Sequence, residues 1–277
     1  MKHIFIGSSG SIATRHIRNL KLLRPDASIV TVDIDGKADY TDYRKVDFTD
    51  TIAYICTPME LHCDQLEYVY YEDARAIFVE KPLYGARDST YITSEIIHED
   101  GVPIVCGYNY RHNPLFQSLK SRADSIAYLH FYGSEDLSPK YGPTALGTMA
   151  SHSIDMALWL LGDPEHCQVA DYGAHCFVGI RHKNKASCNI TASMHSPFRV
   201  ASVTAVFASE SDKDMLYRNG KSDHDLKWEH YFVEPNDEMY LSEMNQWLEY
   251  VEGGSIGNLC GFSEALKVQQ VMSGNSK

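Results

Sequence analysis

The feature that most limits the fold is a glycine turn near the N-terminus, between an apolar run and an amphipathic segment. Residues 2–6 are apolar enough to predict a strand, and the turn from Gly7 to Gly10 follows directly. Residues 14–23 carry apolar side chains at helical spacing, and Pro25 ends that pattern. Such a turn brings backbone N–H groups and the positive end of a helix to one point, where a pyrophosphate can bind.

The spacing of this turn is GxxGxxA, one residue longer at its front than the usual GxGxxG, so an ordinary tight strand-to-helix turn stays an alternative. Gly10 would let the backbone approach the phosphates, and Ala13 would let the helix pack closely on the strand. The next predicted strand, 28–32, ends in Asp33, about 20 residues beyond Ala13. A carboxylate there accepts hydrogen bonds from the adenosine ribose and repels a 2′-phosphate, which favours NAD over NADP. The alternative for Asp33 is a solvated loop acid.

The first part of the chain continues as an alternation of strands and helices. Further strands are predicted at 51–56, 76–79 and 103–106, with helices after the first of them and at 88–98. This alternation predicts an α/β domain over residues 1–107, a Rossmann-type doubly wound parallel sheet whose ligands bind at the carboxyl ends of the strands. Three polar residues fall at such ends: Thr57, Lys81 and Asn109.

From residue 108 to residue 277 the pattern changes to strands typical of an antiparallel sheet. They are predicted at 126–132, 174–182, 186–194, 200–208 and 226–233, and one helix is predicted at 149–161. We therefore expect a second, α+β domain with an open, largely antiparallel sheet. Its terminal helices could pack back on the first domain.

Composition excludes several classes of function. The 25 Lys and Arg against 37 Asp and Glu leave a net charge of −12, which repels nucleic acid. We expect a cytoplasmic protein without a membrane partner, since the apolar start is too short for a secretory signal and no run could span a bilayer. The 7 cysteines include no CxxC pair, so reduced thiols and no metal site are expected.

Several short motifs in order carry a family resemblance. They are Gly10-Ser11-Ile12-Ala13 with Arg15-His16, Ile55-Cys56-Thr57-Pro58 with His62, Glu80-Lys81-Pro82, Gly107-Tyr108-Asn109-Tyr110-Arg111 with Pro114, Gly147 with Ser151-His152-Ser153-Ile154-Asp155, and Trp159-Leu160-Leu161-Gly162. The chain resembles the Gfo/Idh/MocA family, the glucose-fructose oxidoreductase and inositol dehydrogenase group of two-domain nicotinamide enzymes. Residues 239–271 also resemble the closing helices of that family.

The resemblance implies a role for each matching residue. It implies cofactor binding by Gly7, Ser9, Gly10, Ser11, Ile12, Asp33, Thr57, Pro58, His62, Glu80 and Lys81. Lys81 and His152 would be the catalytic residues, and Asn109, Arg111, His152 and Asp155 would bind substrate between the nicotinamide and the second sheet. A homodimer or homotetramer through the open face of that sheet is implied as well.

The expected activity is hydride transfer between NAD and a hydroxyl or keto carbon of a sugar, sugar derivative or cyclitol. Many relatives carry an acid three or four residues before the histidine, where this chain has Met149 and Thr148. Two alternatives therefore stay open: an NAD-binding sensor or assembly protein without catalysis, and a glycoside-cleaving enzyme that uses NAD transiently. At single residues, Lys81 could be an exposed strand-end lysine, His152 a core histidine, and Arg111 a partner of an acid.

Overall fold

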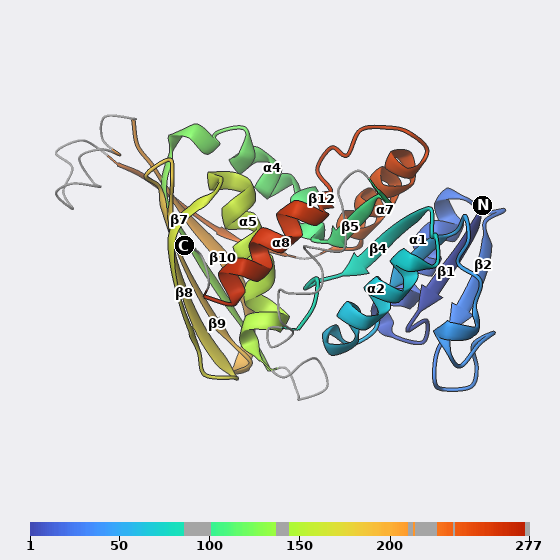
Figure 1. Ribbon diagram of the computed structural model, residues 1–277. Coiled ribbons are helices and arrows are strands. Elements are labelled where there is room, and N and C mark those ends of the chain that lie inside the picture. Colours follow the sequence, from blue (N-terminus) through green and yellow to red (C-terminus); the bar gives the residue numbers. More distant parts are fainter. Residues whose placement is uncertain (86–100, 137–143, 210–212, 214–225, 235, 275–277) are drawn as a thin grey trace. The chain divides into compact units, whose positions relative to one another are not determined.

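The structure is a computed structural model, and it describes residues 1–85, 101–136, 144–209, 213, 226–234 and 236–274 (Figure 1). The chain divides into two compact units. Unit 1 comprises Met1–His112 and Asn236–Gln269, and unit 2 comprises Asn113–Pro235 and Gln270–Lys277. The helix expected at 88–98 lies outside the described residues.

Unit 1 is built on a six-stranded sheet in the order β12-β5-β4-β3-β1-β2. Its strands are β1 (Lys2–Ile6), β2 (Ser28–Val32), β3 (Ile52–Ile55), β4 (Ala76–Glu80), β5 (Ile104–Gly107) and β12 (Cys260–Gly261). All neighbours pair in parallel except β12, an antiparallel edge strand on β5. The chain order reverses at β1, so the carboxyl ends of β1 and β3 form the position where doubly wound sheets bind their ligands.

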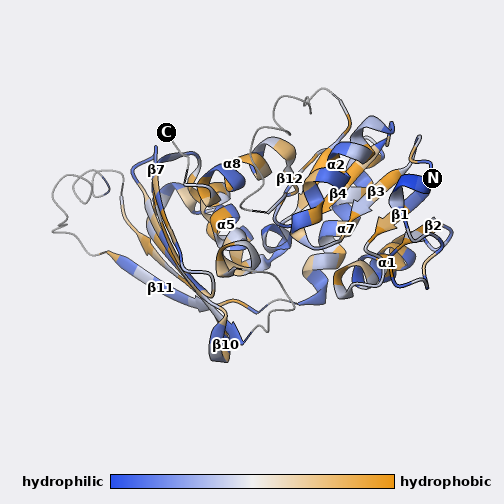
Figure 2. Cartoon of the chain, turned by 60° about the horizontal axis from the view of Figure 1, so that its bottom comes forward, coloured by the Kyte–Doolittle hydropathy of each residue, from blue (hydrophilic) through white to orange (hydrophobic). Residues whose placement is uncertain are grey.

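Helices of unit 1 cover the two faces of this sheet (Figure 2), and its strands β3, β4 and β5 are buried along their whole length. One face carries Phe5, Tyr54 and Phe78, and α1 (Ser11–Leu23) packs there beside α7 (Asp237–Val251). The helix α2 (His62–Tyr71) packs against β3 and β4, and α8 (Phe262–Met272) follows β12. The late helix α7 thus completes the first core, with Trp247 fully buried in it.

Unit 2 holds a second six-stranded sheet, in the order β11-β10-β6-β9-β8-β7. Its strands are β6 (Ile126–Asp136), β7 (Pro164–Asp171), β8 (His175–His182), β9 (Ser187–Ser193), β10 (His195–Phe207) and β11 (Lys227–Phe232). Only β6 and β9 pair in parallel. The sequence prediction missed β7, whose residues are half-exposed and lack a clear alternation of apolar and polar side chains.

One face of this second sheet is covered and the other is open. The helices of unit 2 are α4 (Pro114–Lys120) and α5 (Ser151–Leu161), and α5 packs against β6 and β9. On the opposite face, cross-strand register aligns the exposed aromatic side chains Phe177, Tyr132 and Phe232. The two sheets confirm the expected fold class: a doubly wound parallel sheet followed by an α+β part with a largely antiparallel, open sheet.

Candidate functional site at the carboxyl edge of the parallel sheet

The glycine turn folds tightly against the neighbouring strand end. Gly7 has a φ of +82°, and a Cβ there would lie 2.8 Å from the carbonyl oxygen of Cys56. Its N–H donates to the carbonyl of Val32 at 2.9 Å, so the turn is tied to the ends of both β2 and β3. A Cβ on Gly10 would lie 3.2 Å from the carbonyl oxygen of Gly7. Glycine is therefore required at Gly7, and a side chain at Gly10 would crowd the Gly7 carbonyl.

The helix that follows the turn begins without a capping side chain. Gly10 is the N-cap of α1, and Ser11 and Ile12 open the first turn. Among the described residues no side chain caps α1, so the N–H groups of the first helical turn are available to an anionic ligand at the positive helix end. Ser9, Gly10 and Ser11 are exposed, so solvent and ligands can reach the turn.

Asp33 lies beside this turn, directly after β2. Its carboxylate accepts the Ser9 N–H at 2.9 Å and the Asp35 N–H at 3.3 Å, one on each oxygen. The Ser9 hydroxyl in turn donates to Asp35 at 2.7 Å. A carboxylate oxygen can accept two hydrogen bonds, so Asp33 retains acceptor capacity for hydroxyl groups. Two carboxylates make the space around Asp33 and Asp35 unfavourable for a phosphate group.

The next strand ends are joined by His62, at the start of α2. Its Nε2 lies 2.8 Å from the carbonyl oxygen of Thr57, and its Nδ1 lies 2.8 Å from that of Pro82. Burial lowers the pKa of His62, and the two carbonyl contacts oppose that shift. The Thr57 hydroxyl donates to Gln65 at 2.6 Å. His62 therefore links the loop after β3 with the loop after β4. Pro58 follows Thr57 and precedes the 3-10 turn Met59–Leu61.

Lys81 follows β4 at the same edge of the sheet. The residue is half-buried, and burial lowers the pKa of its ammonium group, against the opposing effect of Glu80 and then of Cys106. Glu80 is buried and forms a pair with His16, with 2.6 Å between Oε1 and Nε2. No role for His16 follows from the sequence pattern, although this histidine lies between Ala13 and Leu20 on the buried stripe of α1.

Asn109 and Arg111 follow β5 and differ in their surroundings. Asn109 is 2% exposed, and its side chain contacts Tyr240, a residue whose pKa is raised by burial. The buried Arg111 guanidinium donates to the carbonyl of Leu259 at 3.1 Å and to Glu264 at 2.9 Å. The substrate-binding roles of both residues stay predictions.

His152 and Asp155 belong to unit 2. A π-helical turn at Leu146–Ala150 leads into α5, and His152 is the second residue of that helix. His152 is half-buried, whereas Asp155 is fully buried within α5. Their catalytic and substrate-binding roles stay predictions.

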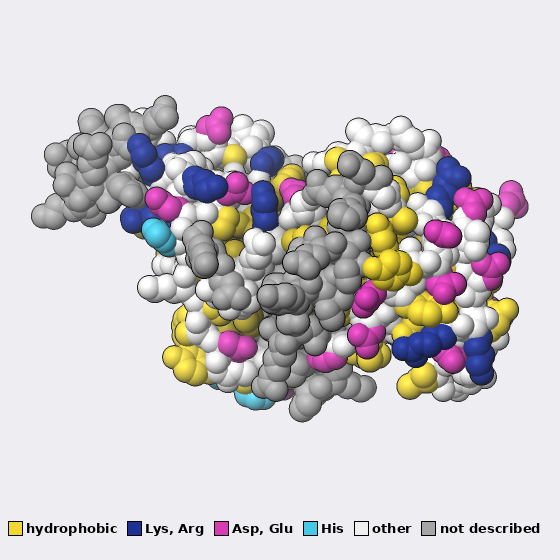
Figure 3. Space-filling view, in the orientation of Figure 1, with side chains coloured by type: hydrophobic (Ala, Val, Ile, Leu, Met, Phe, Trp, Pro, Cys, Tyr) yellow, Lys and Arg dark blue, Asp and Glu magenta, His cyan; other side chains and the backbone are white. Residues whose placement is uncertain are grey.

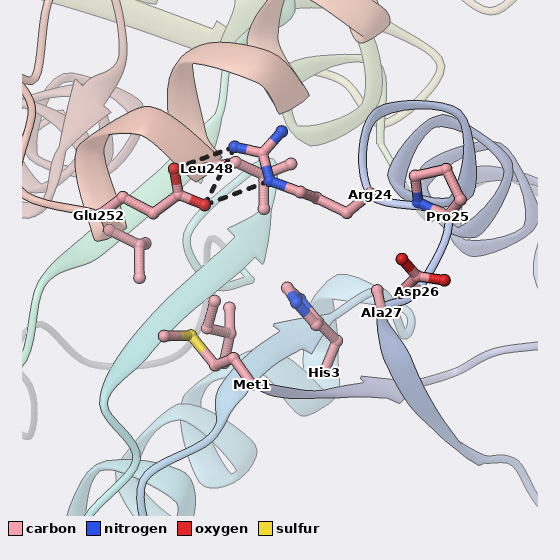
Figure 4. A pocket seen from close by; sticks show the side chains of 10 residues that line it. Met1, His3, Arg24, Pro25, Asp26, Ala27, Leu248 and Glu252 are labelled. Carbon is pink, nitrogen blue, oxygen red and sulfur yellow. Dashed lines mark hydrogen bonds and ion pairs between the residues drawn. The ribbon is translucent and has the colours of Figure 1, made fainter.

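The cavity drawn in Figure 4 lies at the opposite edge of the parallel sheet, where β1, β2 and β3 begin. Its volume is about 310 Å³. His3 and the ion pair of Arg24 with Glu252, 2.9 Å between Nη2 and Oε2, line it. Because doubly wound sheets bind ligands at the carboxyl edge, this cavity is separate from the candidate site.

The visible face of unit 1 is of mixed charge, and the part of the chain that the structure describes holds neither a metal-binding cluster nor a membrane-spanning helix. Acidic and basic side chains interleave over the visible face of unit 1 (Figure 3). Among the described residues, no group of three or more His, Cys, Asp and Glu side chains is placed to hold a metal ion. None of the helices described is both long and apolar enough to cross a membrane.

Comparison with known proteins supports the fold. No family model matches the chain. The uncharacterized oxidoreductase YrbE of Bacillus subtilis is 28% identical over 135 residues, which are 45% of this chain and 39% of that protein. A levoglucosan dehydrogenase in complex with NADH has a TM-score of 0.74 at 16% identity, over 99% of this chain and 95% of that one. The WlbA dehydrogenase of Thermus thermophilus, in complex with NAD and α-ketoglutarate, has a TM-score of 0.72 at 15% identity, over 99% and 94%. At such identities, the structural likeness shows a shared fold.

Proposed function

We propose that this protein is an NAD-dependent oxidoreductase that acts on a hydroxyl or keto carbon of a sugar, sugar derivative or cyclitol. The observation that carries the proposal is the juxtaposition at one sheet edge of the glycine cradle, the Asp33 carboxylate and Lys81. Both structural relatives named above were solved with NADH or NAD, and one is a dehydrogenase of the sugar derivative levoglucosan.

The residues at this edge fit a dinucleotide. The cradle at Gly7 and Gly10 leaves no side chain between the backbone and a pyrophosphate, which the open first turn of α1 would bind. Asp33 would accept hydrogen bonds from the adenosine ribose, and its charge with that of Asp35 would disfavour NADP. When bound, nicotinamide supplies the hydride acceptor or donor.

Lys81 would bind the reacting oxygen of the substrate. As an ammonium group it donates hydrogen bonds, polarises a carbonyl for reduction, and stabilises the oxygen of an alcohol during oxidation. Asn109, which follows β5 at the same sheet edge, would supply a further hydrogen bond to substrate through its amide. We retain His152 as a candidate acid or base and Asp155 as a candidate for substrate binding.

The experiment that tests the proposal is a fluorescence titration with NADH and NADPH, followed by an absorbance screen of polyols and sugar derivatives with NAD. We expect NADH to bind more tightly than NADPH and Asp33→Asn to reduce that preference. Lys81→Met should lower turnover at least 100-fold with little change in NADH affinity. Binding without turnover across the panel would favour the sensor alternative, and no binding of either nucleotide would contradict the proposal.

A further inference from the structure

The buried pair of His16 and Glu80 connects the glycine-turn helix to Lys81. Glu80 is the last residue of β4, and its side chain lies on the sheet face covered by α1. One carboxylate oxygen lies 2.6 Å from Nε2 of His16, which is fully buried. The other accepts the backbone N–H of Lys81 at 3.3 Å. A single carboxylate therefore contacts both the helix that opens the dinucleotide site and the backbone of the candidate catalytic lysine.

The surroundings of His16 indicate how the pair is charged. Its Nδ1 is buried and has no hydrogen-bond partner among the described residues. The ring packs edge-on against Phe78, with centroids 5.1 Å apart, and against Tyr240, with centroids 6.2 Å apart. An imidazolium would bury an unsatisfied N–H donor at Nδ1, whereas a neutral ring protonated on Nε2 needs only the acceptor that Glu80 provides. The geometry therefore favours a neutral histidine that donates to an ionised Glu80.

Gly107 on β5 lies directly beside the Glu80 carboxylate. A Cβ at this position would lie 3.2 Å from Oε1 of Glu80 and 3.1 Å from the ring of Phe78. The absence of a side chain at Gly107 lets the carboxylate sit against the strand. Because Glu80 is only 8% exposed, water screens its charge weakly.

We propose that Glu80, held by His16, is a positioning residue that keeps the ammonium group of Lys81 protonated in the site. The part of this inference that concerns the reacting oxygen rests on the function proposed above. Burial by itself would favour a neutral amine, and the Glu80 carboxylate, which accepts the Lys81 backbone N–H, opposes that effect. Lys81 then acts as a permanent cation toward an oxygen atom, and the base for alcohol oxidation is supplied by another group.

Among the described residues, other titratable groups lie near Glu80 or Lys81. They are His16 of α1, Cys56 after β3, His62 of α2, Cys106 of β5 and Tyr240 of α7, with Glu243 of α7 near Tyr240. Burial raises the pKa of Cys56 well above its usual range and that of Tyr240 above its ordinary value, so both are neutral at neutral pH. Glu80 is therefore the group whose removal should change the charge beside Lys81 most.

The test is a direct titration of Lys81 that needs neither substrate nor cofactor. The full-length protein is labelled with trace acetic anhydride between pH 6 and 11, and acetylation of the Lys81 peptide is measured by mass spectrometry. The exposed Lys21 serves as a reference amine in each sample. The variants are Glu80→Gln, His16→Gln and His16→Leu, with Glu72→Gln on the exposed end of α2 as a charge-matched control. Circular dichroism melts confirm that each variant is folded.

We expect Glu80→Gln to lower the pKa of Lys81 by about one to two units, while Lys21 is unchanged. His16→Gln should leave the Lys81 titration in place because its amide donates the same hydrogen bond. His16→Leu should change the Lys81 titration in the same direction as Glu80→Gln, since one oxygen of the buried carboxylate loses its donor and the ionised form becomes less favourable. An unchanged titration in Glu80→Gln would overturn the proposal, and so would a raised pKa in His16→Gln. NADH binding is measured separately, so failure of the proposed function leaves this result interpretable.

Discussion

At the scale of single residues, the candidate site depends on positions where a side chain cannot fit. Gly7 combines a positive φ with a Cβ position 2.8 Å from a backbone oxygen, so alanine would meet both backbone strain and a steric clash. Gly36 has a similar φ of +73°, with nothing within 4 Å of its Cβ position. Substitution at Gly36 therefore tests backbone strain alone, whereas substitution at Gly7 tests strain together with a steric clash.

We expect Gly7→Ala to destabilise the protein by about 3 kcal/mol and Gly36→Ala by about 1 kcal/mol. Urea denaturation of both variants measures the difference. Gly7→Ala should also weaken NADH binding, whereas Gly36→Ala should leave it unchanged. Equal losses of stability in the two variants would mean that the contact with Cys56 is relieved at no cost.

At the scale of elements, α7 is as much a part of unit 1 as the early helices are. Trp247 is fully buried, its indole N–H donates to the Tyr54 hydroxyl at 3.2 Å, and its ring packs edge-on against Phe78. Arg15 and Arg18 of α1 form ion pairs with Asp237, in the first turn of α7. These ion pairs are exposed, so the buried aromatic contacts supply most of the stabilisation.

Truncation of Trp247 should therefore lower the stability of unit 1 itself. We expect Trp247→Ala to lower the free energy of unfolding by about 3–5 kcal/mol. Tyr71→Ala, at a position that is 60% exposed on α2, should change it by less than about 1 kcal/mol. Chemical denaturation monitored by circular dichroism makes the comparison. A small loss for Trp247→Ala would show that unit 1 is stable without α7.

The open sheet of unit 2 presents aromatic residues that a second copy could cover. Phe177 and Phe232 are 53% and 70% exposed and lie in one cross-strand row with Tyr132. We propose that this face forms the homodimer or homotetramer expected from the sequence. Phe177→Glu with Phe232→Glu should then give a monomer in size-exclusion chromatography with light scattering. Ile34→Glu, at a position 92% exposed in unit 1, is the control. A wild-type monomer would contradict the proposal.

At the scale of the whole molecule, buried histidines make stability depend on pH. Burial lowers the pKa values of His3, His112 and His182 to about 4, from an ordinary value of 6.5. The unfolded chain therefore takes up protons before the folded protein does. The stabilisation from these neutral side chains is complete above pH 6.5 and is lost as the pH falls toward 4.

Each of these histidines should contribute up to about 3 kcal/mol to that loss. We expect the free energy of unfolding to fall steadily between pH 6.5 and 4, as measured by urea denaturation at several pH values. His112→Asn should make the slope shallower, whatever its effect on stability at pH 7. An unchanged slope would mean that His112 has a similar pKa in the folded and unfolded states.

The sequence was sufficient for most strands along the chain, for the glycine turn and for the residues that follow the strands of the parallel sheet. These features are local, because periodicity, turn chemistry and strand ends depend on residues that are close together in the sequence. The alternation also predicted two sheets of different kinds, and both are present. It missed β7, whose partly exposed residues carry little of the pattern that marks a buried strand.

Only the tertiary structure decided which distant residues meet. It pairs His16 with Glu80, engages Arg111 with Leu259 and Glu264, and inserts Trp247 into the core formed by the first strands. These contacts join residues tens to hundreds of positions apart, and no local pattern encodes them. The sequence by itself thus determined which groups lie at the edge of the sheet. Packing decided their buried partners, because desolvation and hydrogen bonding depend on what the fold brings alongside.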